Sequence, residues 1–301
     1  MSVAIEAPVP ESAVSSWRPE RFWRSLVRFT RRQPLGAFGL VVLALIVVMA
    51  VFADFVRTSD PTLIGAGPAL KGPSAQYWFG TNREGQDVWS RVLYGARPTL
   101  IVATLTVVFG LGGGMLLGTL SGYLRGWVDF GISRLAEFIF SFPPIIVGII
   151  VATAMKPGMR SVIVGISIVV VASSTRIMRA AVLQQREMMY VEAARVLGAS
   201  DARIMFRHII PNTLPLGIVL MSALLPTAIL FESSLTFLGF GLPPGEPSWG
   251  ADLSSARRFV TLAPWLAIFP GVALSLTILA FNLLGDSLRD VLDPRLRGTG
   301  V

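Results

Sequence analysis

The sequence predicts an all-α integral membrane protein with six transmembrane helices. Of its 301 residues, 53% are hydrophobic and only 15% are charged, and the mean hydropathy is +0.65. A soluble domain with this composition would leave much apolar surface in contact with water. Uncharged segments that cross a bilayer must be helical, because hydrocarbon offers no hydrogen-bond partner to backbone N–H and C=O groups.

Five uncharged runs are long enough to cross a bilayer, which takes about 20 apolar residues. They cover residues 35–53, 98–124, 138–155, 209–231 and 260–285. A sixth run, 161–175, is shorter, but the arginines that follow it can reach the interface and lengthen it. The predicted organisation is an N-terminal tail with an interfacial helix (1–34), a first span (35–56), an external loop (57–97), a five-helix core (98–285) that includes a connecting segment (184–212), and a C-terminal tail (286–301).

Positive charge is unevenly distributed between the two sides of the predicted bundle. Sixteen of the 26 Lys and Arg residues fall on the side of the two termini, nine fall on the other side, and Arg134 falls near the third span. Since cytoplasmic segments are enriched in Lys and Arg, both termini are predicted to be cytoplasmic. Residues 17–32 interleave aromatic and basic side chains, which is typical of a helix in the headgroup plane. This topology accounts for the net charge of +8, so no nucleic-acid partner is expected.

The segment between the fourth and fifth spans has more internal structure than a connection requires. Residues 187–197 contain no Gly or Pro, and they predict a helix with Met189, Ala193 and Val196 along one stripe. Gly198 follows where a residue in the left-handed conformation would end that helix, because glycine adopts this conformation without a Cβ penalty.

A second helix is predicted directly after this glycine. Ser200 can cap it by accepting a backbone N–H, and Asp201 suits the positive end of its dipole. We expect this helix to end at Pro211. We call residues 187–212 the elbow and interpret it as a docking element for another protein; the alternative is an ordinary connecting loop.

The second span carries glycines at a regular spacing of four residues. They are Gly110, Gly114, Gly118 and Gly122. This spacing places them on one helical face, where the absence of side chains lets another helix approach closely. We interpret this glycine ridge as a packing surface; the alternative is a gating hinge.

Polar side chains within or beside the spans are candidates for a substrate path. They are Glu137, Ser141, Glu232 and Ser233. Carboxylates near the membrane are costly unless paired, and prolines such as those after Ser141 often mark bends beside a path. A structural alternative exists for Glu137, which can pair with Arg134 one helical turn before it.

The residues needed for catalysis are missing. There is no cysteine, and His208 is the sole histidine, so we expect neither a thiolate nor a multi-histidine metal site. No G-x-x-x-x-G-K-[ST] motif occurs, so we expect no nucleotide to bind this chain. The sequence therefore predicts a protein that is not itself an enzyme and holds no cofactor.

The elbow resembles the EAA signature of permease subunits in binding-protein-dependent ABC importers. The resemblance rests on 190–194, Gly198 and 209–212 in the elbow, and on 79–82, 87–91, 93–97, 121–123, 141–143, 235–241, 248–250 and 281–290 elsewhere. Together these segments are similar to the second, shorter permease of dipeptide, oligopeptide and nickel importers. Residues 82–87 depart from the family pattern, which usually shows Asp and then Leu-Gly-Arg before the matched aspartate.

The resemblance implies a type I importer architecture in the bacterial inner membrane. It implies that the first elbow helix couples the chain to an ATPase through Tyr190, Glu192, Ala193, Ala194, Gly198, Ala199 and Pro211. The implied partners are a homologous second permease, two cytoplasmic ATP-binding subunits that use ATP and Mg²⁺, and an external substrate-binding protein. Peptides are the first expectation for the solute and nickel is the next.

Two functions of other classes remain as alternatives. An ion-coupled secondary transporter would use Glu137 or Glu232 as its coupling carboxylate, although no inverted repeat is visible. An intramembrane hydrolase would need a nucleophile and a base that the chain does not offer.

Overall fold

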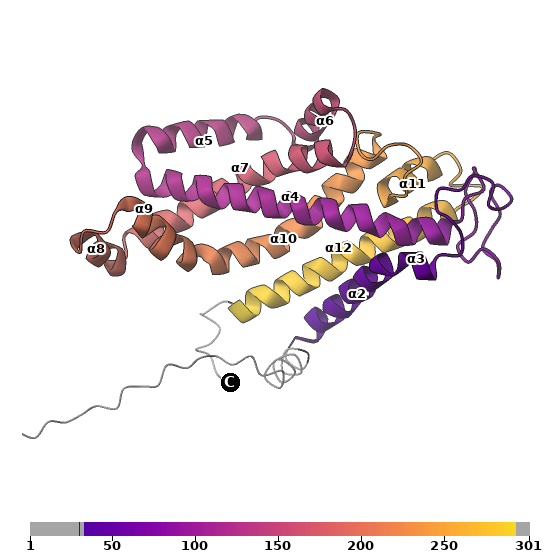
Figure 1. The fold of residues 1–301 in the computed structure, drawn as a ribbon, viewed down its shortest axis with the longest axis horizontal. Coiled ribbons are helices and arrows are strands. Elements are labelled where there is room, and N and C mark those ends of the chain that lie inside the picture. Colours follow the sequence, from indigo (N-terminus) through magenta and orange to yellow (C-terminus); the bar gives the residue numbers. More distant parts are fainter. Residues whose placement is uncertain (1–29, 31–32, 293–301) are drawn as a thin grey trace, which may run out of the picture.

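The computed structural model describes Thr30 and residues 33–292, and this part of the chain is helical throughout its regular structure (Figure 1). The helices are α2 (Pro34–Val51), α3 (Ala53–Val56), α4 (Val88–Leu124), α5 (Gly126–Phe140), α6 (Pro144–Met155), α7 (Met159–Arg186), α8 (Met189–Val196), α9 (Asp201–Ile204), the π-helix η1 (Met205–Ile209), α10 (Ile210–Phe237), α11 (Trp249–Ala256) and α12 (Trp265–Leu292). The predicted interfacial helix over 17–32 lies outside the described residues, apart from Thr30.

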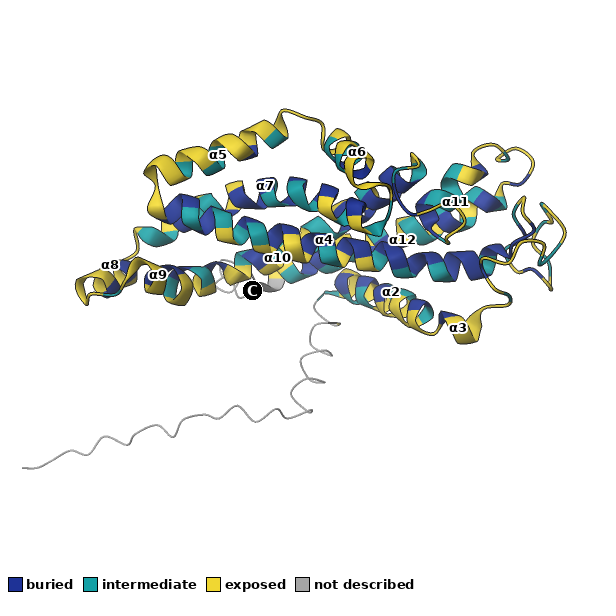
Figure 2. Cartoon of the chain, turned by 45° about the horizontal axis from the view of Figure 1, so that its top comes forward, coloured by how far each residue is buried: buried dark blue, intermediate teal, exposed yellow. Residues whose placement is uncertain are grey.

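The long helices run roughly along one direction, and different segments lie at the two ends of the bundle. The elbow, with α8 and α9, lies at one end, and α11 lies with the loop 57–87 at the other (Figure 1). We call these the elbow end and the loop end. Buried residues are concentrated on α4 and α7, whereas α5 and α8 are largely exposed (Figure 2).

The described helices include five that are long and apolar enough to cross a membrane, or six candidate spans when one bent pair is counted as a single span. The prediction of six spans agrees with the larger of these numbers, but the prediction of a single unbroken third span over 138–155 is wrong. The pair consists of α5 and α6, which meet at 92°. The break falls at Ser141, Phe142 and Pro143, where consecutive prolines disfavour helical geometry in the preceding residue and remove backbone donors.

Helix α4 is longer than the span predicted from hydropathy. It contains 37 residues, begins at Val88 and passes through Pro98 without a break. The first part of α4 thus lies within the segment 57–97 that was predicted as an external loop. At 1.5 Å per residue the helix is about 55 Å long, and it exceeds the hydrocarbon core by many ångströms. Asp87 caps its first turn by accepting the Ser90 backbone N–H at 2.9 Å.

The glycine ridge of α4 lies against α7. A Cβ atom at Gly110 would be 2.5 Å from the Val170 Cβ, and one at Gly118 would be 2.7 Å from the Met178 Cβ and 2.8 Å from the Thr175 carbonyl oxygen. At Gly114 and Gly122 a Cβ would likewise meet α7, including backbone atoms of that helix. Helices α4 and α7 therefore touch almost backbone to backbone, which only glycine permits.

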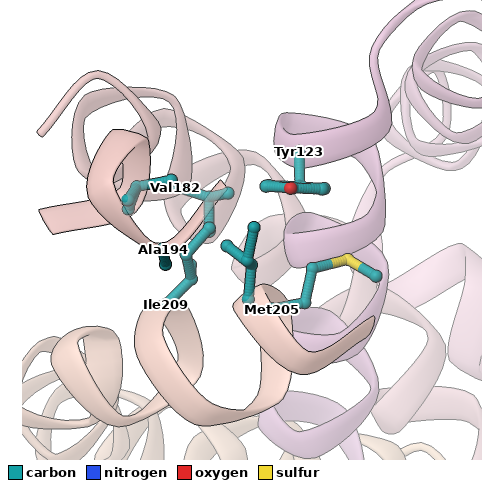
Figure 3. Packing of buried hydrophobic residues seen from close by; sticks show 7 residues of the cluster. Tyr123, Val182, Ala194, Met205 and Ile209 are labelled. Carbon is teal, nitrogen blue, oxygen red and sulfur yellow. The ribbon is translucent and has the colours of Figure 1, made fainter. Parts of the chain in front are cut away.

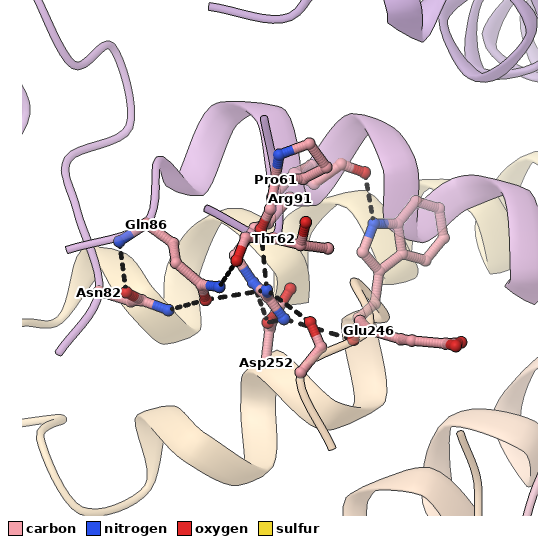
Figure 4. A network of polar contacts seen from close by, with 10 residues as sticks. Pro61, Thr62, Asn82, Gln86, Arg91, Glu246 and Asp252 are labelled. Atoms are coloured by element: carbon pink, nitrogen blue, oxygen red, sulfur yellow. Dashed lines mark hydrogen bonds and ion pairs between the residues drawn. The ribbon is translucent and has the colours of Figure 1, made fainter. Parts of the chain in front are cut away.

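The loop end is held together by the side chain of Arg91, which is 5% exposed (Figure 4). Its Nε donates to Asp252 Oδ1 on α11 at 2.8 Å, and its Nη1 donates to the Pro61 carbonyl at 3.1 Å and to Gln86 Oε1 at 3.0 Å. Asn82 Nδ2 donates to the same Gln86 oxygen at 2.8 Å. The residues that depart from the family pattern thus form an ordered amide pair joined to Arg91.

Candidate functional site

The first elbow helix ends at a glycine, as predicted. Gly198 has φ +79°, its N–H donates to the Arg195 carbonyl at 3.0 Å, and the Ala199 N–H donates to the Ala194 carbonyl at 3.0 Å. These two bonds form a Schellman motif, in which a left-handed residue satisfies the last carbonyls of a helix. A Cβ at this position would meet no atom within 4 Å, so the backbone conformation is what requires glycine.

The second elbow helix differs from the prediction in its length and its end. Ser200 caps it, since its Oγ accepts the Arg203 N–H at 3.4 Å. The α-helical part, α9, lasts only until Ile204 and continues as the π-helix η1. The prediction that Pro211 ends the helix is wrong, because Pro211 stands in the first turn of α10, where no intrahelical N–H is needed.

The inner face of the elbow packs against the ends of α4 and α7. Seven buried residues form this elbow core: Tyr123, Val182, Val191, Ala194, Ile204, Met205 and Ile209. Figure 3 shows the labelled members, which come from α4, α7, α8 and η1, gathered around one centre. Because four of them, on α7, α8, α9 and η1, are 0% exposed, the elbow is a packed structure and not a flexible link.

The outer face of the elbow exposes large apolar side chains. Met189 is 85% exposed, Val196 is 83% exposed and Leu197 is 86% exposed. We call these three residues the apolar crown. Two of them belong to the stripe predicted from sequence, and the structure places that stripe on the outside. An apolar patch at a helix turn, rimmed by polar residues, is typical of a protein interaction site.

The predicted coupling residues divide between the two faces. Tyr190, Glu192, Ala193, Gly198 and Pro211 are exposed, and Ala199 is half-buried. Ala194 lies in the elbow core at 9% exposure, so it shapes the elbow from within. The prediction that Ala194 contacts a partner therefore does not fit its position.

The pKa values of two ionisable groups in the elbow lie above their ordinary values. Partial burial raises the pKa of the Tyr190 hydroxyl, which donates to Gln185 Oε1 at 2.7 Å. The pKa of Arg195 is raised, first by its hydrogen bond with the Tyr123 hydroxyl. Tyr123 was not among the predicted coupling residues, although it belongs to the motif over 121–123.

The four candidate path residues lie on two different elements. Glu137 and Ser141 belong to the exposed helix α5 and its end, where Glu137 pairs with Arg134 at 2.6 Å. Glu232 is 0% exposed on α10, and its carboxylate accepts the hydroxyls of Ser233 at 3.1 Å and Thr236 at 3.0 Å. In the described part of the chain, no Lys or Arg forms an ion pair with Glu232.

One member of the set faces an open groove. Ser233 and Ser234 line it from α10, together with Ile145 of α6, Leu253 of α11 and Leu274 of α12, and its volume is about 470 Å³. The groove has two serines on one side, and its other lining residues are aliphatic or are the aromatic Phe231 and Phe237. Of the candidate path residues, only Ser233 lines this groove.

The fold and the elbow together define a polytopic membrane protein with a packed helical elbow that exposes an apolar crown. Residues 114–298 match the family model of binding-protein-dependent transport system inner membrane components, and residues 21–73 match that of the N-terminal transmembrane domain of oligopeptide transport permease C. The chain belongs to the first of these families, whose members are permease subunits of ABC importers.

Similar proteins come from several bacteria. The chain is 36% identical to a dipeptide transport system permease protein of Alkalihalophilus pseudofirmus, over 97% of this chain and 95% of that protein. It is 40% identical to a glutathione transport system permease protein of Pectobacterium atrosepticum, over 95% of this chain and 94% of that protein. Both relatives are permeases, so an ion-coupled secondary transporter is excluded as the function of this chain.

A solved structure supports the fold. A chain of the inward-facing MetNI methionine ABC transporter aligns with a TM-score of 0.54 at 17% sequence identity, over 67% of this chain and 96% of that one. The type I importer fold predicted from the resemblance is thereby confirmed. The protein is a multi-pass component of the inner membrane.

Proposed function

We propose that this chain forms half of the translocation pathway of an importer for short peptides, and that its elbow docks onto a separate ATP-hydrolysing subunit. The observation that carries the docking proposal is the apolar crown, in which three large side chains are more than 80% exposed on a well-packed support. Burying one such side chain is worth about 1.5–3 kcal/mol, so a complementary cleft would gain several kcal/mol from the crown.

The remaining partners follow from the family and from the charge pattern. A second, homologous permease completes the pathway, an external binding protein delivers the solute, and two ATP-binding subunits bind ATP and Mg²⁺. The elbow end faces the cytoplasm, because the Arg-rich segments fall on this side and ATP is available there. The crown then projects from the bilayer toward the ATPase.

Short peptides are the proposed solutes. Relatives that resemble this chain over nearly its whole length are named for dipeptide and glutathione transport, and glutathione is itself a small peptide. The groove beside Ser233 offers hydroxyls next to aliphatic and aromatic walls, which suits a peptide backbone with varied side chains. Glu137, Ser141 and Glu232 remain candidate path residues. The test is uptake of labelled dipeptides and of glutathione into proteoliposomes that hold the complete complex; uptake of neither would refute the assignment of solute.

The docking proposal is tested by Leu197→Glu, which places a charge in the crown without touching the elbow core. We expect the variant to insert normally and to retain the ATPase at least about tenfold more weakly when the tagged chain is purified in mild detergent. Leu262→Glu changes an equally apolar residue, 67% exposed near the loop end, and serves as the control. Equal retention of the ATPase by the two variants would refute the docking proposal.

The turn at Gly198 gives a second test that leaves the crown intact. Gly198→Val forces a β-branched residue into a left-handed conformation, whereas Gly198→Asn introduces a residue that tolerates it. We expect uptake to be lost with Val and largely kept with Asn, with both variants present in the membrane. Normal uptake by Gly198→Val would contradict this role of the turn.

A further inference from the structure

Tyr123 connects the core of the bundle to the elbow. It is the second-last residue of α4, it is 4% exposed, and its hydroxyl donates to Asp201 Oδ1 on α9 at 2.6 Å. Arg186, at the end of α7, donates from Nη1 to the Tyr123 backbone carbonyl at 2.8 Å and lies 5.6 Å above the Tyr123 ring. Tyr123 is thus bonded to α9 through its hydroxyl, and it contacts α7 through its backbone carbonyl and its ring.

Both elbow helices contribute to the surroundings of Tyr123. Asp201 on α9 accepts a hydrogen bond from the Tyr123 hydroxyl, and Val191 and Ala194 of α8 belong to the same buried cluster as Tyr123. Below the hydroxyl, the Tyr123 ring belongs to the elbow core with Val182 and Val191 (Figure 3). The contact is therefore both polar and apolar, and hydrogen bonds to charged groups are the stronger kind.

The connection from the elbow to α10 is built differently. It passes through η1, whose π-helical bonds are rare and are often found at functional bends, and then through Pro211, which has no N–H to donate. Asn212 Nδ2 donates to the His208 carbonyl at 2.5 Å and bridges this interruption with a side chain. Pro215 and Pro226 inside α10 also lack an N–H, so the feature that distinguishes the junction with the elbow is the π-helical bonding of η1 directly before Pro211.

The glycine ridge makes α4 and α7 a single unit up to the elbow. Gly118 and Gly122 lie against α7 within the last turns of α4, directly before Tyr123. A force applied to Tyr123 therefore reaches both helices, because their backbones are in contact and cannot slide apart without losing that packing.

We propose that the elbow and the ends of α4 and α7 move as one rigid body, that Tyr123 is the positioning residue which transmits the movement of the ATPase to α4, and that α10 turns relative to this body at Pro211. The proposal rests on the proposed docking of the elbow to an ATPase. It adds which helices receive the movement and which residue passes it on.

The first experiment separates transmission from assembly. In proteoliposomes with the complete complex, Tyr123→Phe keeps the ring and removes the hydroxyl. We expect the complex to assemble and to hydrolyse ATP, while solute uptake per ATP hydrolysed falls about tenfold, as the loss of one hydrogen bond to a charged group would give. Thr153→Val removes a hydroxyl that bonds only within α6, and it should leave this ratio unchanged.

Variants at Asp201 identify the bond itself. Asp201→Ala removes the acceptor and should lower the uptake per ATP as Tyr123→Phe does, and the double variant should be no worse than either single one. Asp201→Asn keeps an acceptor oxygen and should restore most of the coupling. An unchanged ratio in Tyr123→Phe, or a fall in uptake and hydrolysis together, would overturn the role of Tyr123.

The second experiment measures the rigid body directly. The chain has no cysteine, so pairs of spin labels can be placed freely. Ala202 on α9, Gln184 on α7 and Leu214 on α10 are all exposed and lie outside the crown. Between the nucleotide-free and ATP-trapped complex, we expect the 202–184 distance to stay constant and the 202–214 distance to change. A changing 202–184 distance would overturn the proposal. Failure of the unaltered chain to retain an ATPase would instead refute the docking on which it rests.

Discussion

A single methyl group on the glycine ridge should destabilise the fold. Gly118→Ala would place its Cβ 2.7 Å from the Met178 Cβ, 2.8 Å from the Thr175 carbonyl oxygen and 3.0 Å from the Arg179 backbone nitrogen. Real Cβ atoms do not approach neighbours this closely, and none of these atoms is the movable end of a side chain. Helices α4 and α7 must therefore separate locally, and overpacking of this kind costs about 1–3 kcal/mol.

The same helix supplies a matched control. Gly112 lies on the exposed face of α4, and a Cβ there would meet nothing within 4 Å. Gly112→Ala adds the same methyl group and removes the same backbone freedom, which favours the helix by about 0.5–1 kcal/mol. The difference between the two variants isolates the contact with α7, and we expect it to be about 1–3 kcal/mol, or a factor of roughly 5 to 150 in the folded-to-unfolded ratio.

The assay is reversible unfolding in mild detergent by titration with sodium dodecyl sulfate, followed by tryptophan fluorescence. We expect Gly118→Ala to unfold at a lower mole fraction of the denaturing detergent than the unaltered chain, and Gly112→Ala to unfold at the same or a higher one. If Gly118→Ala were as stable as Gly112→Ala, the close contact of α4 with α7 would not be the feature that requires glycine, and the reasoning would fail.

Local rules account for the parts of the elbow that the sequence predicted correctly. The left-handed turn at Gly198 and the cap at Ser200 each depend on a few consecutive residues, so the local sequence is enough to locate them. The end at Pro211 was wrong because proline is accepted in the first turn of a helix as well as after the last. Which of these applies depends on η1, whose packing against the elbow core is not local.

The bend between α5 and α6 likewise could not be predicted from local sequence. The prolines after Ser141 indicated a disturbance, but hydropathy runs evenly across 138–155 and gives no angle. The angle of 92° depends on what the two helices pack against, namely α4 and α7 for α5, and α7 and α10 for α6. The uncharged runs supplied the number of predicted spans, and only the structure locates the break.

Long-range contacts explain the functional residues that sequence reasoning missed. Tyr123 meets Asp201 across 78 positions of sequence, and nothing in the helical period of α4 indicates such a partner. The only signal was the motif over 121–123. Glu232 follows an uncharged run in the sequence, and the structure buries it completely with hydroxyl donors from its own helix.

The loop end offers two further predictions, both read from chymotrypsin cleavage within residues 57–87 of the purified protein, where Tyr77, Trp78 and Phe79 supply cleavage sites that the variants do not alter. Arg91→Ala leaves Asp252 buried without its cation, which costs about 3–5 kcal/mol, so we expect faster cleavage, whereas Glu84→Ala on the exposed turn should not accelerate it. Gln86→Arg removes the oxygen that accepts from Asn82 and Arg91 and puts a second guanidinium beside the first, so it should also accelerate cleavage. Adding Asn82→Asp restores a partner for the new cation, and the double variant should recover resistance with a coupling energy of about 0.5–3 kcal/mol. Additive effects of the two changes would mean that Asn82 and Gln86 do not act as a unit. The amide pair of this chain would then not be a replacement for an ion pair at the same two positions in the family pattern.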